Sequence, residues 1–344
     1  MYKTQVFPGD AARSGGMRPD SRSLTEERRQ PTAVDNSFGV GGSTRPDSHS
    51  FTAERCWPAY IDCTFSVAGD GRTALGRLRF AGPLRVQRVF YPEKEHAEGA
   101  ALPCHCCLLH PPGGLVSGDS LSITCRVSPG AHCLVTTPSA GKIYKSDDRR
   151  VPQEQHSCVT LENGILEWLP QENIIFNGAE ARLHTDFFLE GRCRLLAWDI
   201  HCLGRRAGGE AFEQGRLVLR TRIFRDGLPL LHERLDLEGG SMLRTNPAGL
   251  NGASVLASFY ACGRGDDDDD DEALRGACEG IRERFGPAAL PQGQSGATCR
   301  DGMLVARYLG NDGAEALRFC RGAWRITRPL LPGLAARAPR VWGD

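Results

Sequence analysis

Three carboxylates in predicted strands stand out by their strand parity. Glu233 shares its strand face with three leucines, and Asp119 has the parity of the apolar residues in the alternating run Leu121 to Val127. Asp199 lies in LLAWDIHCLGR on the face that also carries His201. Alternation along a strand therefore predicts that all three carboxylates are at least partly enclosed.

An isolated buried carboxylate is destabilising unless it becomes neutral or finds a partner. We therefore expect each of the three to be paired with a cation, hydrated in a channel or bound to a metal ion. Salt bridges to nearby arginines, such as Arg234 or Arg205, are the purely structural explanation. The residues alone leave these alternatives open.

The densest group of soft metal ligands is Cys104-His105-Cys106-Cys107, with His110 three residues further on. Thiolates and imidazoles suit zinc or nickel, but strand alternation points Cys104 and Cys106 away from His105 and Cys107. The sequence offers no second Cys-x-x-Cys element at a recognised spacing. We therefore interpret these cysteines as packed thiols rather than as a closed metal site.

The loop from His110 to Ser120 has the G-x-x-x-x-G spacing of a phosphate-binding loop, but two features argue against that function. Asp119 stands where a lysine should meet the phosphates, and a strand rather than a helix is predicted next. The chain also has no G-x-S-x-G elbow and no H-E-x-x-H motif. These motifs do not suggest an enzyme.

The composition excludes several other classes of protein. Of 344 residues, 42 are basic and 42 acidic, and this balance does not favour binding to nucleic acid or to a membrane surface. We find no apolar stretch long enough to cross a bilayer and no signal peptide, so we expect a soluble cytoplasmic protein. In that reducing compartment the 14 cysteines should be free thiols.

The chain divides into an unusual tail and a body. Residues 1–55 are rich in Ser, Arg and Gly and contain a duplicated segment, RPDSRSLTEER and RPDSHSFTAER. We predict that this tail is disordered, because it has too few apolar residues to form a core. Residues 56–344 form the predicted domain, with an acidic loop at 264–272 inside it.

The body reads as mainly β, with about ten short strands separated by turn residues. A hairpin is predicted from Arg216 to Leu237 through Asp226-Gly227. Three helices are predicted towards the C-terminus. The first spans about 246–263. The second begins after the Asp266–Asp271 run and ends at Gly286. The third begins at Asp312 and ends before Pro329.

Five long motifs, in one order, resemble the family of the urease accessory protein UreD, also called UreH. Similarity continues through the closing segment from Arg307 to Trp342, so the resemblance covers about 57–342. The motifs are RVQRVFYPE (85–93), LLHPPGGLVSGD (108–119), TTPSAGKIYKS (136–146), LEWLPQENIIFNGAEARL (166–183) and LLAWDIHCLGRRAGGEAFEQG (195–215).

The resemblance implies a β-helix-like body with a few C-terminal α-helices and a non-enzymatic role as a urease maturation chaperone. Members of the family bind apo-urease and UreF, and UreF docks the nickel-carrying GTPase UreG. No permanent cofactor is implied, because nickel(II) passes through an internal acidic channel. By motif, the channel residues are Asp119, Asp199 and Glu233, with His110 as a further candidate ligand, and Gly141 replaces a small hydroxyl residue of the channel.

Two alternatives accompany this interpretation. The chain can act purely as a scaffold that bridges urease and its activators without carrying nickel. It can also be a metal-dependent hydrolase with Asp119, Asp199 and His110 as ligands, although no catalytic motif supports that reading.

Overall fold

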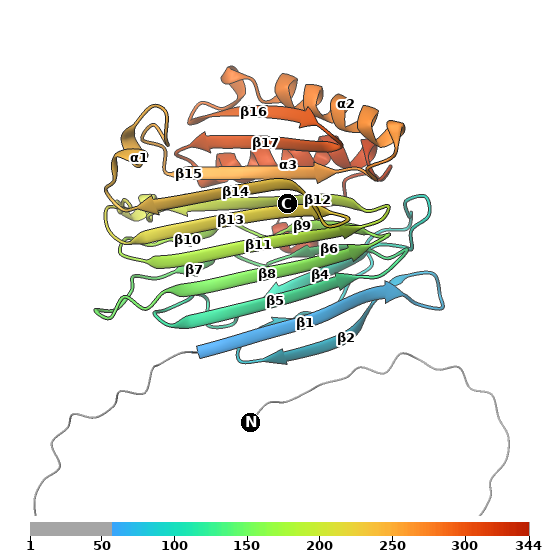
Figure 1. Cartoon of the computed structure of the whole chain (residues 1–344), viewed down its shortest axis with the longest axis horizontal. Coiled ribbons are helices and arrows are strands. Elements are labelled where there is room, and N and C mark those ends of the chain that lie inside the picture. Colours follow the sequence, from blue (N-terminus) through green and yellow to red (C-terminus); the bar gives the residue numbers. More distant parts are fainter. Residues whose placement is uncertain (1–56, 344) are drawn as a thin grey trace, which may run out of the picture. The chain divides into compact units, whose positions relative to one another are not determined.

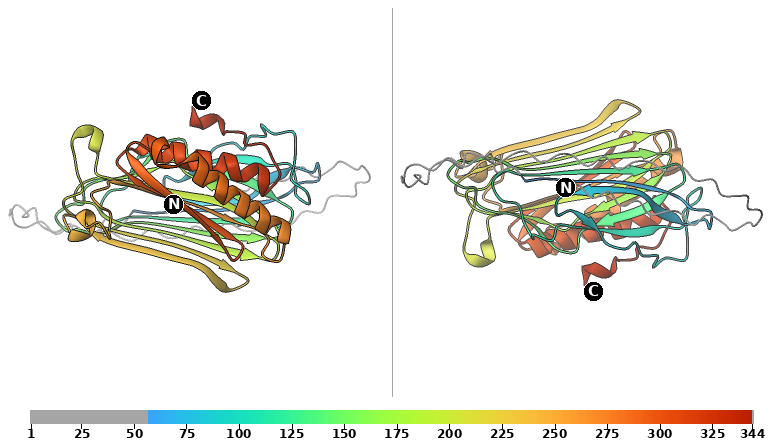
Figure 2. Two further views of the ribbon diagram at one scale, coloured as in Figure 1. Left: turned by 90° about the horizontal axis from the view of Figure 1, so that it is seen from above. Right: turned by 90° about the horizontal axis from the view of Figure 1, so that it is seen from below.

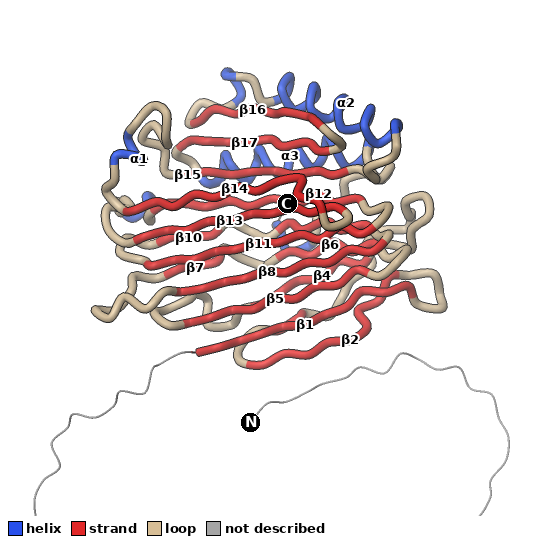
Figure 3. The backbone as a smooth tube through the Cα atoms, viewed as in Figure 1, coloured by secondary structure: helices blue, strands red, loops and turns tan. Residues whose placement is uncertain are grey.

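The computed structural model describes residues 57–343, which are mainly β, as the sequence predicts. Two sheets stack face to face, and helices near the C-terminus cover part of one of them (Figures 1 and 3). The tail at 1–55 with its duplicated segment lies outside the described residues. No helix among residues 57–343 is long and apolar enough to cross a bilayer.

The first sheet has seven strands in the order β14-β13-β11-β8-β5-β1-β2. Its five central strands run parallel, and an antiparallel strand closes each edge. The predicted hairpin is confirmed as β13 and β14. The strands are β1 (Trp57–Val67), β2 (Thr73–Ala81), β5 (Asp119–Val127), β8 (Gln153–Glu162), β11 (Glu180–Glu190), β13 (Arg216–Arg225) and β14 (Leu228–Glu238).

The second sheet has ten strands, of which eight follow the order β16-β17-β15-β12-β9-β6-β4-β3, while β10 and β7 pair beside β12. Its strands β4, β6, β9 and β12 are parallel. The strands are β3 (Arg85–Val86), β4 (Cys104–Leu109), β6 (His132–Thr136), β7 (Gly141–Ile143), β9 (Ile165–Leu169), β10 (Asn173–Ile175), β12 (Arg194–Leu203), β15 (Val255–Cys262), β16 (Gly293–Arg300) and β17 (Met303–Gly310).

From β5 to β13 the chain passes repeatedly from one sheet to the other, and equivalent turns stack on one another. The backbone N–H of Gly130 donates to the carbonyl of Asn163 (2.9 Å), and the N–H of Asn163 donates to that of Glu190 (3.0 Å). Gly130, Asn163 and Gly191 all have positive φ, which Gly and Asn adopt most easily. We call one passage of the chain through both sheets a coil, and these turn residues hold successive coils in register.

The main core fills the space between the two sheets. Alternate residues of each strand point inwards, so that β8 contributes Val159 and β11 contributes Phe187, both fully buried. Phe187 meets Trp168 of the opposite sheet edge to face, with ring centroids 6.4 Å apart. This apolar contact across the two sheets fixes their separation.

A second core lies on the other side of the ten-stranded sheet, beneath α2 (Asp268–Arg284) and α3 (Gly313–Leu330) (Figure 2). The fully buried rings of Phe319 and Trp324 fill its centre. The Phe285 ring packs on Phe319 at 5.0 Å, next to Gly322 of α3. The remaining helical segments are short: α1 (Met242–Thr245) and three 3₁₀ turns at Arg206–Gly208, Pro287–Ala289 and Arg340–Trp342.

The helix predicted for 246–263 is wrong, because Val255–Cys262 forms the buried strand β15. Val255, Ala257 and Phe259 face the helices, whereas Tyr260 faces the core between the sheets. A strand covered on both faces is apolar at both parities, so its sequence does not show the alternation of a half-exposed strand.

The acidic loop predicted at 264–272 is also corrected, because α2 already begins at Asp268. The side chain of Asp267 caps this helix by accepting from the backbone N–H of Asp270 (3.1 Å). Consecutive carboxylates in the first turn interact favourably with the helix dipole. The sequence prediction of a favourable charge at this helix N-terminus is confirmed, but the prediction of a solvated loop is not.

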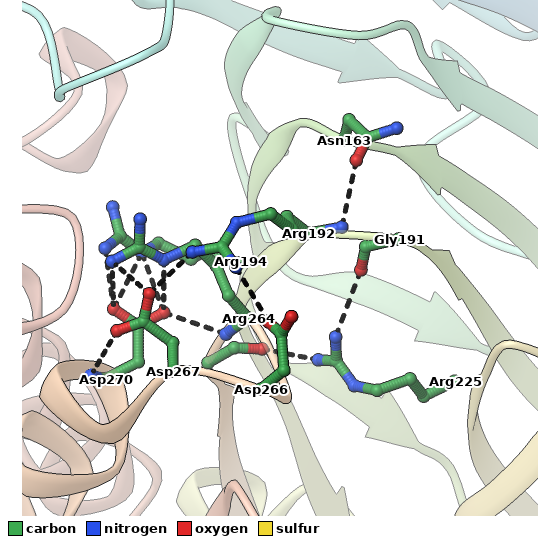
Figure 4. A network of polar contacts seen from close by, with 10 residues as sticks. Asn163, Gly191, Arg192, Arg194, Arg225, Arg264, Asp266, Asp267 and Asp270 are labelled. Carbon is green, nitrogen blue, oxygen red and sulfur yellow. Dashed lines mark hydrogen bonds and ion pairs between the residues drawn. The ribbon is translucent and has the colours of Figure 1, made fainter.

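Arginines from the ends of neighbouring strands hold this acidic turn (Figure 4). Arg194 binds the buried Asp270 at 2.6 Å, and Arg192 binds Asp267 at 2.6 Å. Arg264 contacts both carboxylates, at 2.9 and 3.1 Å. Burial raises the pKa of Asp270, but the hydrogen bonds from Arg194 and Arg264 lower it by more, so the net pKa falls below its ordinary value.

Helix α3 begins at the predicted cap, where Asp312 accepts from the backbone N–H groups of Ala314 (2.7 Å) and Glu315 (3.1 Å). It does not end before Pro329, since the helix continues to Leu330. The ring of Pro329 comes in the last turn of the helix, so only the backbone hydrogen bond of one residue is lost.

Near the end of α3, Arg328 is fully buried and contacts two carboxylates. Its Nη2 lies 2.7 Å from Oε1 of Glu93, and its Nε lies 2.9 Å from Oε2 of Glu167. His132 Nε2 (2.8 Å) and Trp324 Nε1 (2.6 Å) also bind Glu167. Although burial raises the pKa of Glu167, these partners, Arg328 foremost, lower it to about 2.

Candidate functional site

Two neighbouring cavities meet at Asp199. The glycine-loop cavity, of about 460 Å³, lies beneath the loop that begins at His110 and is bordered by Lys142 and Trp168. The hairpin cavity, of about 520 Å³, lies against the β13–β14 hairpin and is bordered by Glu233. Among residues 57–343, Asp199 is the one residue that lines both cavities.

Asp199 is half-buried in β12, with the parity that the sequence indicates. Its Oδ2 accepts a hydrogen bond from the Thr221 hydroxyl at 3.0 Å. Burial raises the pKa of Asp199 to about 6, and this hydrogen bond opposes the shift. The carboxyl group therefore ionises close to neutral pH, and it lies next to space that water or a hydrated ion can occupy.

Glu233 lies at the edge of the hairpin cavity and already has two partners. Its Oε2 accepts from the Tyr260 hydroxyl at 2.7 Å, and its Oε1 forms an ion pair with Arg307. The expectation of a nearby arginine is therefore met by Arg307 on β17 rather than by Arg234, which pairs with Asp236 at 3.0 Å. The charge of Glu233 is partly compensated in the resting structure.

Asp119 lies outside the lining of both cavities. It begins β5, and its Oδ2 accepts from the backbone N–H of Val116 at 2.9 Å, which closes the turn after the glycine loop. His110 does line the glycine-loop cavity, where burial lowers its pKa while Asp119 opposes that shift. His110 and Asp199 thus line one cavity, and Asp199 and Glu233 line the other, whereas Asp119 lines neither.

The glycine loop serves packing rather than phosphate binding. Gly113 and Gly118 have φ values of 79° and 83°, and a Cβ at Gly114 would lie 2.5 Å from the Tyr144 ring. The following segment is the strand β5, so the loop does not point a helix N-terminus at an anion.

The cysteines of 104–107 are packed in the core, as predicted. All three are buried and free. Burial raises the pKa of Cys104 to about 12 and that of Cys107 to about 11, so both remain protonated thiols at neutral pH. His105 is turned away and binds Glu93 at 2.8 Å. Within 57–343, no group of three or more His, Cys, Asp or Glu side chains is placed to hold a metal ion.

Sequence reasoning missed several residues of the hairpin cavity. The sequence pattern predicts a helix at Tyr260, where the structure has a strand. Arg307, the ion-pair partner of Glu233, lies 74 residues from it in the chain. Thr221 faces Asp199 from the other sheet, across the interior. Strand parity indicates which residues share a face, but it does not indicate which strands of the two sheets face each other.

A sequence profile described as "UreD urease accessory protein" matches residues 58–343. The chain belongs to the UreD family. A UreD protein of Chromohalobacter salexigens is 41% identical over 79% of this chain and 85% of its own length. Those of Klebsiella aerogenes and Marinobacter nauticus are 39% and 42% identical, over 79% and 78% of this chain and 92% and 86% of their own lengths.

In this UreD chain, four of the five motifs that carry the family resemblance contribute residues to the lining of the glycine-loop cavity, whereas RVQRVFYPE lines neither cavity. LLHPPGGLVSGD and TTPSAGKIYKS both contribute residues to the lining of the glycine-loop cavity. The AWD segment contributes Asp199, which lines both cavities. The departure at Gly141 has a structural counterpart, since Asn173 Oδ1 lies too close to the position of a Cβ at 141 for one to fit without a shift.

Proposed function

We propose that this chain is a non-catalytic urease maturation protein that binds apo-urease together with UreF and, through UreF, the GTPase UreG. Membership of the UreD family supports the role in urease maturation. We further propose that nickel(II), the cargo, passes through the glycine-loop cavity and the hairpin cavity, with His110, Asp199 and Glu233 along the way. The observation that carries this step is that Asp199 lines both cavities.

The size and chemistry of the cavities support such a route. A nickel ion with six waters needs about 180 Å³ at roughly 30 Å³ per water, less than either cavity provides. Carboxylates bind nickel(II) less tightly than a set of thiolates or imidazoles, so each stop releases the ion easily. The absence of a three-ligand group among the described residues agrees with transfer rather than storage.

Asp119 receives a different role in this proposal. Since its carboxylate closes the turn before β5, Asp119 holds the conformation of the loop that lines the glycine-loop cavity and adds negative potential near His110. We therefore assign the contacts with the ion to Asp199 and Glu233, and to Asp119 an indirect effect.

The test is co-expression of urease and its accessory proteins with the wild-type chain, with Asp199→Asn, with Glu233→Gln and with the double variant. The control is Asp236→Asn, which makes the same kind of change on the outer side of β14. Complex yield, nickel per urease active site and urease activity are measured for each.

A conduit predicts normal complex yield, with nickel content that falls most in the double variant and stays normal in the control. Loss of complex yield in parallel with nickel would instead indicate that the carboxylates are structural. Unchanged nickel content in all variants would favour the scaffold that does not carry the ion.

A further inference from the structure

The imidazole of His201 lines the hairpin cavity two residues along β12 from Asp199, and within residues 57–343 no protein group forms a hydrogen bond with its Nδ1. His201 is 7% exposed and lines the hairpin cavity, while its Nδ1 is enclosed without a hydrogen-bond partner. His105 and His132 also have an unpaired Nδ1, but each binds a carboxylate through Nε2. His201 differs from both, because no carboxylate in the described part of the chain forms an ion pair with its ring.

Two residues close to His201 in the sheet carry side-chain oxygens. Asp199 precedes it by two residues on β12, so both side chains leave the same face of the strand, with Cα atoms about 6.7 Å apart at the usual rise. Asn173 is its direct partner on the parallel strand β10 and lines the glycine-loop cavity. These adjacent strand positions therefore bring together one imidazole, one carboxylate and one amide.

The same row of the sheet contains Gly141, the partner of Asn173 on β7. The Asn173 side chain reaches into the space above Gly141, where the resemblance leads us to expect a small hydroxyl group. Gly141, Asn173 and His201 are thus direct register partners on the three neighbouring strands β7, β10 and β12.

We propose that His201, with Asp199 and Asn173, forms the transfer site at which nickel(II) crosses from one cavity to the other. This proposal rests on the proposed nickel route and names a ligand within it. A neutral imidazole has a free lone pair and suits nickel(II), and two or three protein ligands leave the remaining positions to water.

The test measures nickel binding to the purified full-length chain by equilibrium dialysis against NiCl₂, with X-ray absorption at the nickel edge to detect imidazole. The variants are His201→Leu and Asp199→Asn. The control is His184→Leu, the same change on the half-buried outer face of β11, away from both cavities. His201→Gln is included in case the leucine variant folds poorly, since an amide binds nickel(II) more weakly than an imidazole.

We expect His201→Leu to weaken nickel binding by about tenfold or more and to remove the imidazole signal, with His184→Leu unchanged. Unchanged affinity in His201→Leu and His201→Gln, together with weaker binding in Asp199→Asn, would overturn the role of His201 while leaving the route intact. If Asp199→Asn also left binding unchanged, and urease nickel were normal in co-expression, both the route and the transfer site would be refuted.

Discussion

Replacing Arg328 by Met should strongly destabilise the body of the protein. The Arg328 side chain is completely buried, and removing its charge leaves the buried carboxylates of Glu93 and Glu167 without their shared cation. Breaking one buried ion pair by removing one partner costs about 3–5 kcal/mol. Two carboxylates lose their cation here, but His105 still binds Glu93, and His132 still binds Glu167. We therefore expect a loss near the upper end, about 5 kcal/mol.

The assay is thermal unfolding of the full-length chain at pH 7.5, followed by circular dichroism. At roughly 1.7 °C per kcal/mol for a domain of this size, Tm should fall by about 8 °C. Arg216→Met is the matched control, because Arg216 forms a pair of similar geometry with Asp236 at the surface, where solvent screens the interaction. Its Tm should stay close to that of the wild type.

Neutralising both carboxylates in the same chain distinguishes electrostatics from lost packing. If charge is the cause, combining Arg328→Met with Glu93→Gln and Glu167→Gln should recover part of the lost stability, as hydrophobic or neutral replacement of a buried ionic cluster often does. A Tm of Arg328→Met equal to that of the wild type would refute the reasoning, as would a triple variant less stable than Arg328→Met alone.

Three further predictions concern acid stability, helix packing and the hairpin cavity. Because the pKa of Glu167 is about 2 when folded and ordinarily 4.5, its stabilising effect is complete above pH 4.5 and is lost as the pH falls towards 2. Glu167→Gln should therefore flatten the dependence of Tm on pH in this range, and an unchanged slope would contradict the shift. Gly276→Ala, in an open position of α2, should stabilise by about 0.5–1 kcal/mol, whereas Gly322→Ala should lower Tm because the new Cβ overlaps an aromatic ring; equal effects would refute this packing. Arg307→Gln should tighten nickel binding in equilibrium dialysis by releasing Glu233, and weaker binding would show that Arg307 organises the site.

Local patterns predicted much of the fold. Alternation identified β5, the turn at Asp226-Gly227 identified the β13–β14 hairpin, and the cap at Asp312 identified the start of α3. These features depend on residues close together in the chain. The strand β15 was missed because its two covered faces remove the alternation on which the prediction depends.

The candidate site was predictable in part, for a similar reason. Parity correctly placed Asp199 and His201 on one face, and it marked Glu233 as unusual. It gave no indication that Arg307 neutralises Glu233, or that Asp119 is engaged by its own turn. Such contacts depend on how the strands stack, and this follows from the whole arrangement of coils rather than from any one segment.

The parallel coils also determine how this chain acquires its structure. Strand β5 pairs with β8, β8 with β11 and β11 with β13, between residues 28 to 36 positions apart, as in the pairs Ser120–Glu154, Gln153–Ala181 and Glu180–Arg216. Each coil must close a long loop before its hydrogen bonds form, and such topologies fold slowly, over milliseconds to seconds or longer. Until the next coil arrives, the last completed strand presents an open parallel edge that can pair with another chain. We therefore expect the yield of native protein to depend on the rate of synthesis and on temperature, with slower production at lower temperature favouring the native state over aggregates.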